Sequence, residues 1–211
     1  MRAFIIMGRV LKAAYEELFL CVYLSIAWWL SFLPLGITVA PATMGMHKVA
    51  NRMANYKRVD NGFFWEGFRA YFGQGQLMLA IDLLVPGAIL FNIWFYANSG
   101  SWLPALGLLW FWVLLFSLLA GMYLIPLFWQ QDEPHIRLAL RNAALLTLKY
   151  PLYSLLMLIF LLLMLALSFV TVLPMVLLAP ALIAITGNFA LAGMLQEMGL
   201  SPEPPEGPAR D

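Results

Sequence analysis

Long apolar runs constrain this chain more than any other feature of its sequence. A helix of about 20 apolar residues is long enough to cross the hydrocarbon core of a bilayer. The sequence predicts five such spans: about Leu18 to Ala40, Leu77 to Tyr96, Leu103 to Trp129, Pro151 to Val172 and Met175 to Leu195. Hydrophobic residues make up 63% of the chain and charged residues only 11%, which excludes a soluble domain. We therefore expect an all-α membrane protein, a bundle of about five transmembrane helices.

Proline and glycine interrupt three of these runs, the second of them at Pro86 and Gly87. Pro34 and Gly36 predict a kink or a break in the first span, because proline removes a backbone donor and crowds the preceding turn. A complete break there would change the number of crossings. Pro180 and Gly187 interrupt the last span in the same way.

No polar stretch is long enough to form a separate soluble module. We expect one transmembrane helical domain over residues 1–198 and a disordered, Pro-rich tail over residues 199–211. A cleaved leader is not expected, because the first apolar run begins only at Leu18. Cys21 is the single cysteine, so the chain has no internal disulfide.

The longest polar island runs from Ala42 to Gly73, between the first two apolar runs. At 100° per residue its first half predicts an amphipathic helix of the interfacial type, with basic residues flanking an apolar face. The apolar face is made up of Met46, Val49, Ala50, Met53, Ala54 and Tyr56.

A second short helix is predicted in the same island, over Phe63 to Phe72. Asp60 or Asn61 is expected to cap its start, and Gly73 with Gly75 to end it. Its aromatic residues are expected at the membrane interface: Phe64, Trp65, Phe68, Tyr71 and Phe72.

The second polar island runs from Gln130 to Tyr150. Asp132 is expected to cap its helix, with Pro134 in the first turn, and Arg137 and Arg141 lie one turn apart. Five spans would put the two islands and the tail on one side of the membrane and the N-terminus on the other. The positive-inside rule then places the two amphipathic islands in the cytoplasm.

The cations of the islands are candidates for docking: Lys48, Arg52, Arg58, Arg69, Arg137, Arg141 and Lys149. Anchoring to a lipid bilayer with anionic headgroups needs only clustered cations beside apolar faces. Docking onto a membrane-protein partner, or onto a second copy in a homo-oligomer, would use the same helices. Nucleic-acid binding is not expected, because it requires a larger solvated basic surface.

Three polar side chains fall inside predicted spans, namely Asp82, Asn92 and Asn188. An ionisable group within a span is costly and suggests a function, such as a proton or substrate relay. Asp82 nevertheless lies only a turn or two inside its span, which favours a structural ion pair or hydrogen bond. The two asparagines are expected to join helices rather than to line a pathway.

The sequence has no motif of a catalytic site. It contains no GxxxxGK[ST] or GxGxxG nucleotide loop and no HExxH. His47 and His135 sit in separate islands, and no third ligand accompanies them, so neither a metal nor a cofactor is expected. We therefore expect that the protein is not an enzyme.

Short motifs in the islands resemble the bacterial YesL-like family. They are Pro41-Ala42-Thr43, the run Phe64 to Arg69, and Asn142 to Leu146 followed by Pro151. The resemblance implies a small integral membrane protein without an established activity, often encoded beside carbohydrate ABC-transporter components. It supplies no catalytic residues. The hydrophilic spacer Asn55 to Asn61 is longer than in that family.

The predicted function follows from these patterns and from the resemblance. We expect a multi-pass protein of the bacterial inner membrane that acts as an accessory or assembly factor for a membrane transport system, with carbohydrate ABC uptake favoured. The alternative is a small transporter or channel-like carrier, with a polar path near Asp82, Asn92 and Asn188.

Overall fold

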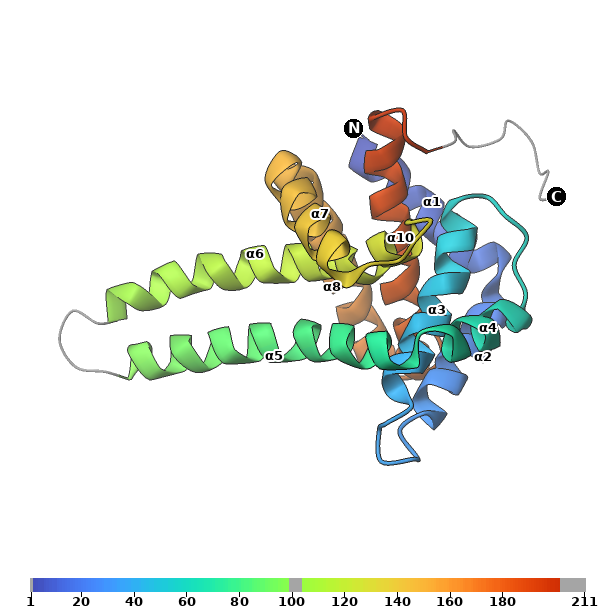
Figure 1. The fold of residues 1–211 in the computed structure, drawn as a ribbon, viewed down its shortest axis with the longest axis horizontal. Coiled ribbons are helices and arrows are strands. Elements are labelled where there is room, and N and C mark those ends of the chain that lie inside the picture. The colour runs from blue at the N-terminus through green and yellow to red at the C-terminus, as the bar shows by residue number, and fades with distance from the viewer. Residues whose placement is uncertain (1, 99–103, 202–211) are drawn as a thin grey trace.

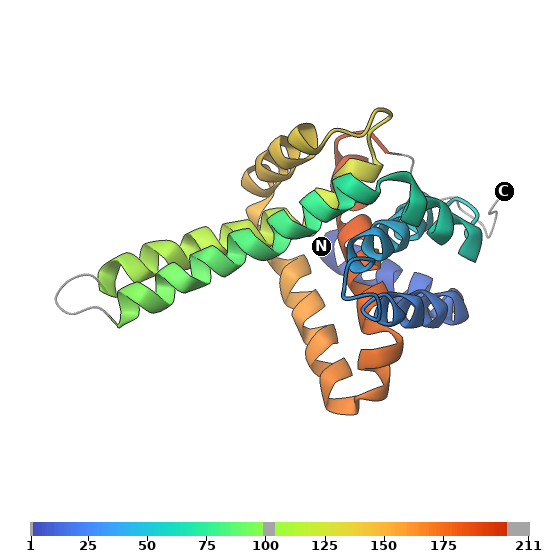
Figure 2. The ribbon, with the colours of Figure 1, turned by 60° about the horizontal axis from the view of Figure 1, so that its bottom comes forward.

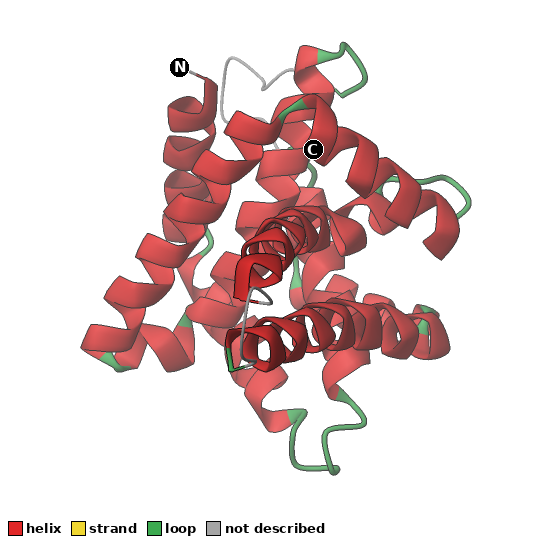
Figure 3. Cartoon of the chain, turned by 90° about the vertical axis from the view of Figure 1, so that its left-hand side faces the viewer, coloured by secondary structure: helices red, strands yellow, loops and turns green. Residues whose placement is uncertain are grey.

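The computed structural model describes residues 2–98 and 104–201, and every regular element in this part of the chain is an α-helix. Short loops and turns join the helices (Figure 3). In chain order they are α1 (Arg2–Glu16), α2 (Leu18–Leu30), α3 (Val39–Ala54), α4 (Asn61–Ala70), α5 (Phe72–Ala97), α6 (Pro104–Trp129), α7 (Ile136–Lys149), α8 (Pro151–Thr171), α9 (Leu173–Leu177) and α10 (Ala179–Glu197). Most of the predicted tail, residues 202–211, lies outside the described residues.

Four helices have the length and apolar composition of membrane spans. They are Phe72–Ala97, Leu106–Trp129, Pro151–Thr171 and Ala179–Glu197. The predicted class, an all-α membrane protein, is therefore confirmed, and these helices match the second to fifth predicted spans.

The first predicted span does not form one crossing helix. α2 has 13 residues, which correspond to about 20 Å and fall short of a hydrocarbon core of about 30 Å. The turn at residues 31–38 reverses the chain, and α3 runs back beside α2 (Figure 1). Leu35 (φ 52°) and Gly36 (φ 75°) both have left-handed backbone in that turn. The break predicted at Pro34 and Gly36 is thus confirmed, and it is complete.

The last predicted span is also broken, but close to its start. α9 ends at Leu177, and α10 begins at Ala179 with Pro180 in its first turn. Proline is tolerated there because the first turn lacks intrahelical acceptors for its N–H groups. Gly187, by contrast, lies within continuous helix. The predicted interruption at Gly187 is therefore wrong, and so is the one at Pro86 and Gly87, which lie within continuous helix α5.

α10 is the central helix of the fold and is buried along nearly its whole length. Helices α1, α2, α3, α6 and α8 all contact it. Glycine allows this close packing: a Cβ at Gly187 would lie 2.8 Å from the Met122 carbonyl oxygen of α6, and a Cβ at Gly193 would lie 2.6 Å from Tyr153 Oη of α8. Gly187 thus serves helix–helix packing.

α5 and α6 form a long helical hairpin that projects away from α8 and α10 (Figures 1 and 2). We call it the arm. Its surface carries many exposed large apolar side chains, including Leu84, Phe91, Trp94, Leu108 and Trp112. Lipid tails are as apolar as leucine, so a bilayer can cover this surface without a partner.

α1 packs along the C-terminal part of α10. Arg9 Nη1 donates to Gln196 Oε1 at 3.1 Å, and buried Ile6 lies against Gly193. The prediction that the N-terminus and the C-terminal end lie on opposite sides is therefore wrong for this structure. The physical reason is the reversal after α2, which removes one crossing.

α3 and α4 approach closely because each contributes a glycine to their contact. A Cβ at Gly67 would lie 2.8 Å from Gly45 Cα, and a Cβ at Gly45 would collide with the Phe64 carbonyl oxygen. Backbone atoms on both sides leave no flexible group that could move aside. These two glycines hold α4, and with it the start of α5, against α3.

We predict that Gly45→Ala destabilises the protein by about 1–3 kcal/mol, the usual cost of adding a methyl group to a tightly packed contact. The matched control is Gly73→Ala, since no neighbouring atom lies within 4 Å of the Cβ position there. That helical position should gain up to about 1 kcal/mol from alanine. Thermal unfolding in detergent measures both, and equal melting temperatures would contradict the packing argument.

Candidate functional site

The apolar face predicted for the first island is buried inside the protein. Met46, Val49, Ala50, Met53 and Ala54 are all buried in α3. Other helices of the chain, mainly α4 and α10, cover α3. The expectation of an interfacial helix is therefore wrong for α3, because protein occupies the place predicted for lipid.

α4 begins as predicted and ends earlier. Asp60 is its N-cap, and Asp60 Oδ1 accepts a hydrogen bond of 2.7 Å from the Gly62 N–H. The helix ends at Ala70, and Tyr71 separates it from α5. The predicted stop at Gly73 and Gly75 is wrong: both are in α5, and buried Gly75 lies against α3.

The predicted interfacial aromatic residues divide into buried and exposed ones. Phe64 is buried, with Trp65 5.1 Å and Phe68 6.2 Å from it between ring centroids. Tyr71 packs edge-on against Phe128 of α6 at 5.1 Å, so these rings join α4 to neighbouring helices. Trp65 and Phe72 are exposed, whereas Phe68 and Tyr71 are half-buried. Trp65 Nε1 donates to Tyr23 Oη at 2.8 Å.

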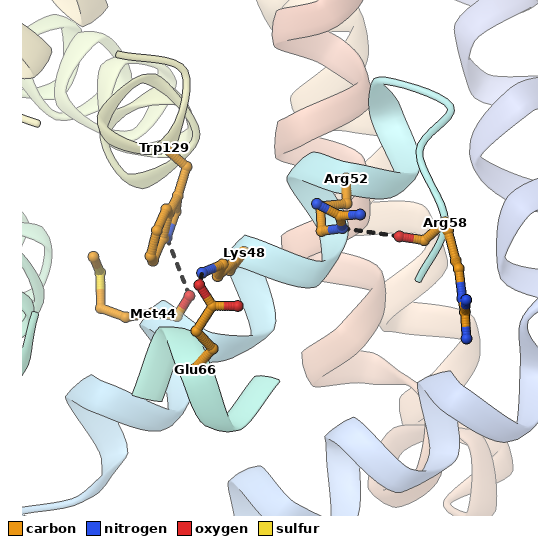
Figure 4. Close-up of polar contacts among 6 residues, drawn as sticks. All are labelled: Met44, Lys48, Arg52, Arg58, Glu66 and Trp129. Atoms are coloured by element: carbon orange, nitrogen blue, oxygen red, sulfur yellow. Dashed lines mark hydrogen bonds and ion pairs between the residues drawn. The ribbon is translucent and has the colours of Figure 1, made fainter. Parts of the chain in front are cut away.

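Lys48 makes contacts within the protein (Figure 4). Lys48 Nζ lies 2.5 Å from Glu66 Oε1 and 5.2 Å from the centre of the Trp129 ring. Its side chain is only 16% exposed. Trp129 Nε1 in turn donates to the Met44 carbonyl oxygen at 3.1 Å. Lys48 therefore links α3, α4 and α6 and is not free to bind a headgroup.

Arg52 is also engaged within the protein (Figure 4). Arg52 Nε donates to the Arg58 carbonyl oxygen at 2.8 Å, and the guanidinium carbon lies 3.7 Å from the centre of the Phe63 ring. This cation holds the loop between α3 and α4. The Arg58 side chain points away from that contact (Figure 4).

Four of the predicted docking cations are exposed: Arg58, Arg69, Arg137 and Arg141. None of their guanidinium groups makes a hydrogen bond or ion pair with another described residue. Lys149 is exposed as well, but its Nζ contacts Met198 Sδ at 3.4 Å and lies 5.3 Å from the Tyr150 ring centre. The predicted set thus divides into structural cations and free cations.

α7 starts later than predicted. His135 is its N-cap residue, and the Gln131 side-chain oxygen accepts from the His135 N–H at 2.9 Å. The predicted Asp132 cap and the placement of Pro134 in the first turn are wrong, because the chain at 131–135 is not yet helical. No side-chain cap bond reaches the first turn of α7 from His135.

The two polar islands meet at one end of the fold. Asn51 Nδ2 and Asn55 Nδ2 donate to Gln130 Oε1 at 3.0 and 3.3 Å. Ser201 Oγ donates to Asn55 Oδ1 at 3.4 Å, which brings the start of the tail to the same place. The two islands and Ser201 thus lie at one end of the fold, as a shared side requires. The side of the membrane on which they lie stays a prediction.

A cavity of about 800 Å³ lies between the arm and the rest of the helices, and Asp82 lines it. The expected ion pair or hydrogen bond of Asp82 is wrong for this structure, since no such contact reaches its carboxylate within residues 2–98 and 104–201. Asn92 Nδ2 donates to the Ala88 carbonyl oxygen of its own helix at 3.1 Å. The carboxylate thus faces the cavity without a protein partner.

Asn188 joins α10 to α3, as predicted for a polar residue between helices. Asn188 Nδ2 lies 3.1 Å from His47 Nδ1, and both side chains are buried. Burial lowers the pKa of His47 to about 3, so its ring is neutral at pH 7. The sequence does not predict that His47 pairs with Asn188. It does indicate that His47 is buried, because Ala50 and Ala54, three and seven residues further on, lie on the same apolar face of the helix.

No group of three His, Cys, Asp or Glu side chains within the described part of the chain is close enough to hold a metal ion. Comparisons of the chain with protein-family models, with curated proteins and with solved structures find no match. The resemblance to the YesL-like family stays a prediction from the motif residues.

We predict that Lys48→Gln and Arg52→Gln each lower the stability by roughly 0.5–1 kcal/mol, because each removes a cation that joins structural elements. Arg137→Gln and Arg141→Gln serve as matched controls and should change it by less than about 0.5 kcal/mol. Melting temperatures of the purified protein in detergent compare the four variants. A larger loss in the α7 variants would contradict the division into structural and free cations.

We predict that acidification destabilises the protein partly through His47. Its pKa of about 3 in the folded state lies below the ordinary value of 6.5, so the unfolded state binds more protons between these values. Stability therefore falls as the pH drops below 6.5, by on the order of 2 kcal/mol at about pH 5. His47→Gln should lose less stability between neutral pH and about pH 5. Unfolding curves that shift equally in both proteins would refute the prediction.

Proposed function

We propose that this protein is a non-enzymatic accessory or assembly factor for a transport system of the bacterial inner membrane. The observation that carries the proposal is the presence of exposed cations with no role in holding the fold. Arg137 and Arg141 on α7 are the clearest pair, since both are exposed and neither contacts another described charged group. Unpaired guanidinium groups suit anionic headgroups and acidic protein surfaces alike.

α7 has the pattern of an interfacial helix. Its buried side contains Ala139, Ala143, Leu146 and Thr147. Its exposed side carries Arg137 and Arg141 at one end and Leu145 and Leu148 toward the other. Such a stripe can place its leucines at the edge of the acyl region while the arginines reach phosphate groups. The interfacial pattern that the sequence suggested for α3 is therefore found on α7.

The carrier alternative has less support. Its three proposed polar residues do not line one path: Asp82 lines the cavity, Asn188 is buried against His47, and Asn92 bonds to its own helix. A relay requires polar groups within reach of one another across the membrane. The link to carbohydrate uptake rests on the resemblance to the YesL-like family, and the cytoplasmic placement of the islands rests on the positive-inside rule.

We predict that the double variant Arg137→Glu/Arg141→Glu no longer co-purifies with a component of a membrane transport system. The control, Arg137→Lys/Arg141→Lys, keeps the charge and should keep at least part of the complex. Because each cation near an anionic leaflet contributes about 1 kcal/mol, reversal of two should remove most of the bound partner and anionic lipid. Quantitative mass spectrometry of each tagged variant, purified in mild detergent, measures the bound partner and the bound anionic lipid.

Lys48 and Arg52 are left unchanged in this experiment, because their replacement would disturb the fold itself. A double Glu variant that retains the same partner at the same yield would remove α7 as the docking surface. A wild-type protein that captures no transport component would contradict the accessory function.

A further inference from the structure

The cavity beside Asp82 has the dimensions of a site for a small molecule. Its volume of about 800 Å³ falls within the range of ligand pockets, about 300–1,000 Å³. The arm forms one wall through α5 and α6, and residues of α2, α3, α8, α9 and α10 form the others. Most of the lining is apolar, and it includes four leucines of α8.

The other polar groups that line the cavity have partners of their own. Trp28 Nε1 donates to Thr43 Oγ1 at 2.9 Å, and Thr43 Oγ1 donates to the Val39 carbonyl oxygen at 2.8 Å. Ser117 Oγ donates to the Leu114 carbonyl oxygen at 2.8 Å. Asp82 is thus the one polar lining group without a partner among the described residues.

No Lys or Arg of the described residues lines the cavity to compensate the carboxylate. His47 is the other ionisable residue in the lining, and its burial keeps it neutral. Gly121 of α6 stands directly against Asp82: a Cβ at this position would lie 3.1 Å from Asp82 Oδ1. An unpaired carboxylate in such surroundings is costly and is stabilised by a cation that enters the cavity.

The rest of the lining selects the kind of cation. Trp28 and Trp29 line the cavity with their N–H groups engaged, since Trp29 Nε1 donates to the Val176 carbonyl oxygen at 2.9 Å. Their rings also pack against each other and against Phe32. Aromatic ring faces attract organic cations such as quaternary ammonium groups. A small metal ion would need several oxygen ligands, and Asp82 supplies the only carboxylate in the lining.

The cavity can be reached from the membrane. Leu83, Leu162 and Phe169 line it and are each more than half exposed, at 63%, 54% and 67%. These side chains lie on α5 and α8, two of the helices with the character of membrane spans. A ligand that partitions into the bilayer would therefore meet the opening.

We propose that this cavity binds a lipophilic organic cation, with the cationic centre beside the Asp82 carboxylate and apolar substituents against the leucines of α8. The site adds a small-molecule ligand to the docking role proposed above and does not depend on it. Removal of arginines on α7 should leave this binding unchanged.

The test measures binding of tetraphenylphosphonium to the purified full-length protein in nanodiscs of zwitterionic lipid, by equilibrium dialysis corrected for empty nanodiscs. The wild-type protein should bind the phosphonium at least tenfold more tightly than the Asp82→Asn variant. Asp132→Asn is the matched control, since Asp132 is an exposed carboxylate outside the cavity. Tetraphenylborate, an anion of the same shape, should bind weakly to all three proteins.

A second variant tests the space instead of the charge. Leu158→Trp adds a bulky ring to the wall of the cavity and keeps Asp82. It should also weaken phosphonium binding at least several-fold, while its melting temperature shows that the protein is folded. Phosphonium binding that is unchanged in Asp82→Asn or in Leu158→Trp would overturn the proposal. Equal binding of the cation and the anion by the wild type would show simple apolar partition and overturn it too.

Discussion

The enclosure of α10 is the constraint on which the rest of the structure depends. Its small residues, among them Ala184, Gly187 and Gly193, leave backbone close to the helix surface, and neighbouring helices approach to make contact there. Inside a membrane the hydrophobic effect does not draw helices together, so close packing and hydrogen bonds between helices provide the attraction. α1, α3, α6 and α8 supply those contacts, and the direction of each helix depends on how it packs against α10.

Hydrogen bonds reinforce this packing at buried positions. Asn188 meets His47 of α3, and Tyr153 Oη of α8 donates to the Ala190 carbonyl oxygen at 3.0 Å. Tyr123 Oη of α6 donates to Ser154 Oγ at 3.0 Å. Each polar group is worth little in net energy, but a buried one without a partner is costly, so the pairs restrict how the helices can be arranged. The arm projects away from these packed helices (Figures 1 and 2).

The features that sequence could predict are those that depend on short stretches of chain. Apolar length alone located four spans, Pro34 and Gly36 located the reversal, and Asp60 located a cap. The errors are of two kinds: helix ends, such as the cap expected at Asp132 and the stop expected at Gly73 and Gly75, and contacts between distant segments. In the sequence, the spacing of Lys48 and Arg52 is that of free interfacial cations. Only the structure shows that Lys48 contacts Glu66 and Trp129 and that Arg52 contacts the Arg58 carbonyl. In the same way, no local pattern shows that Asp82 faces a cavity instead of a lysine.

The cavity lies between the arm and the other helices, so its shape depends on the position of the arm. Asp82 of α5 and Gly121 of α6 line the cavity from the arm, and Leu158 and Leu162 of α8 line it from the other helices. A change in the angle between the arm and the other helices therefore alters the width of the cavity. A membrane partner that held the arm at one angle would favour or disfavour the ligand. Thermodynamic linkage then requires the ligand to change the affinity for that partner by the same factor.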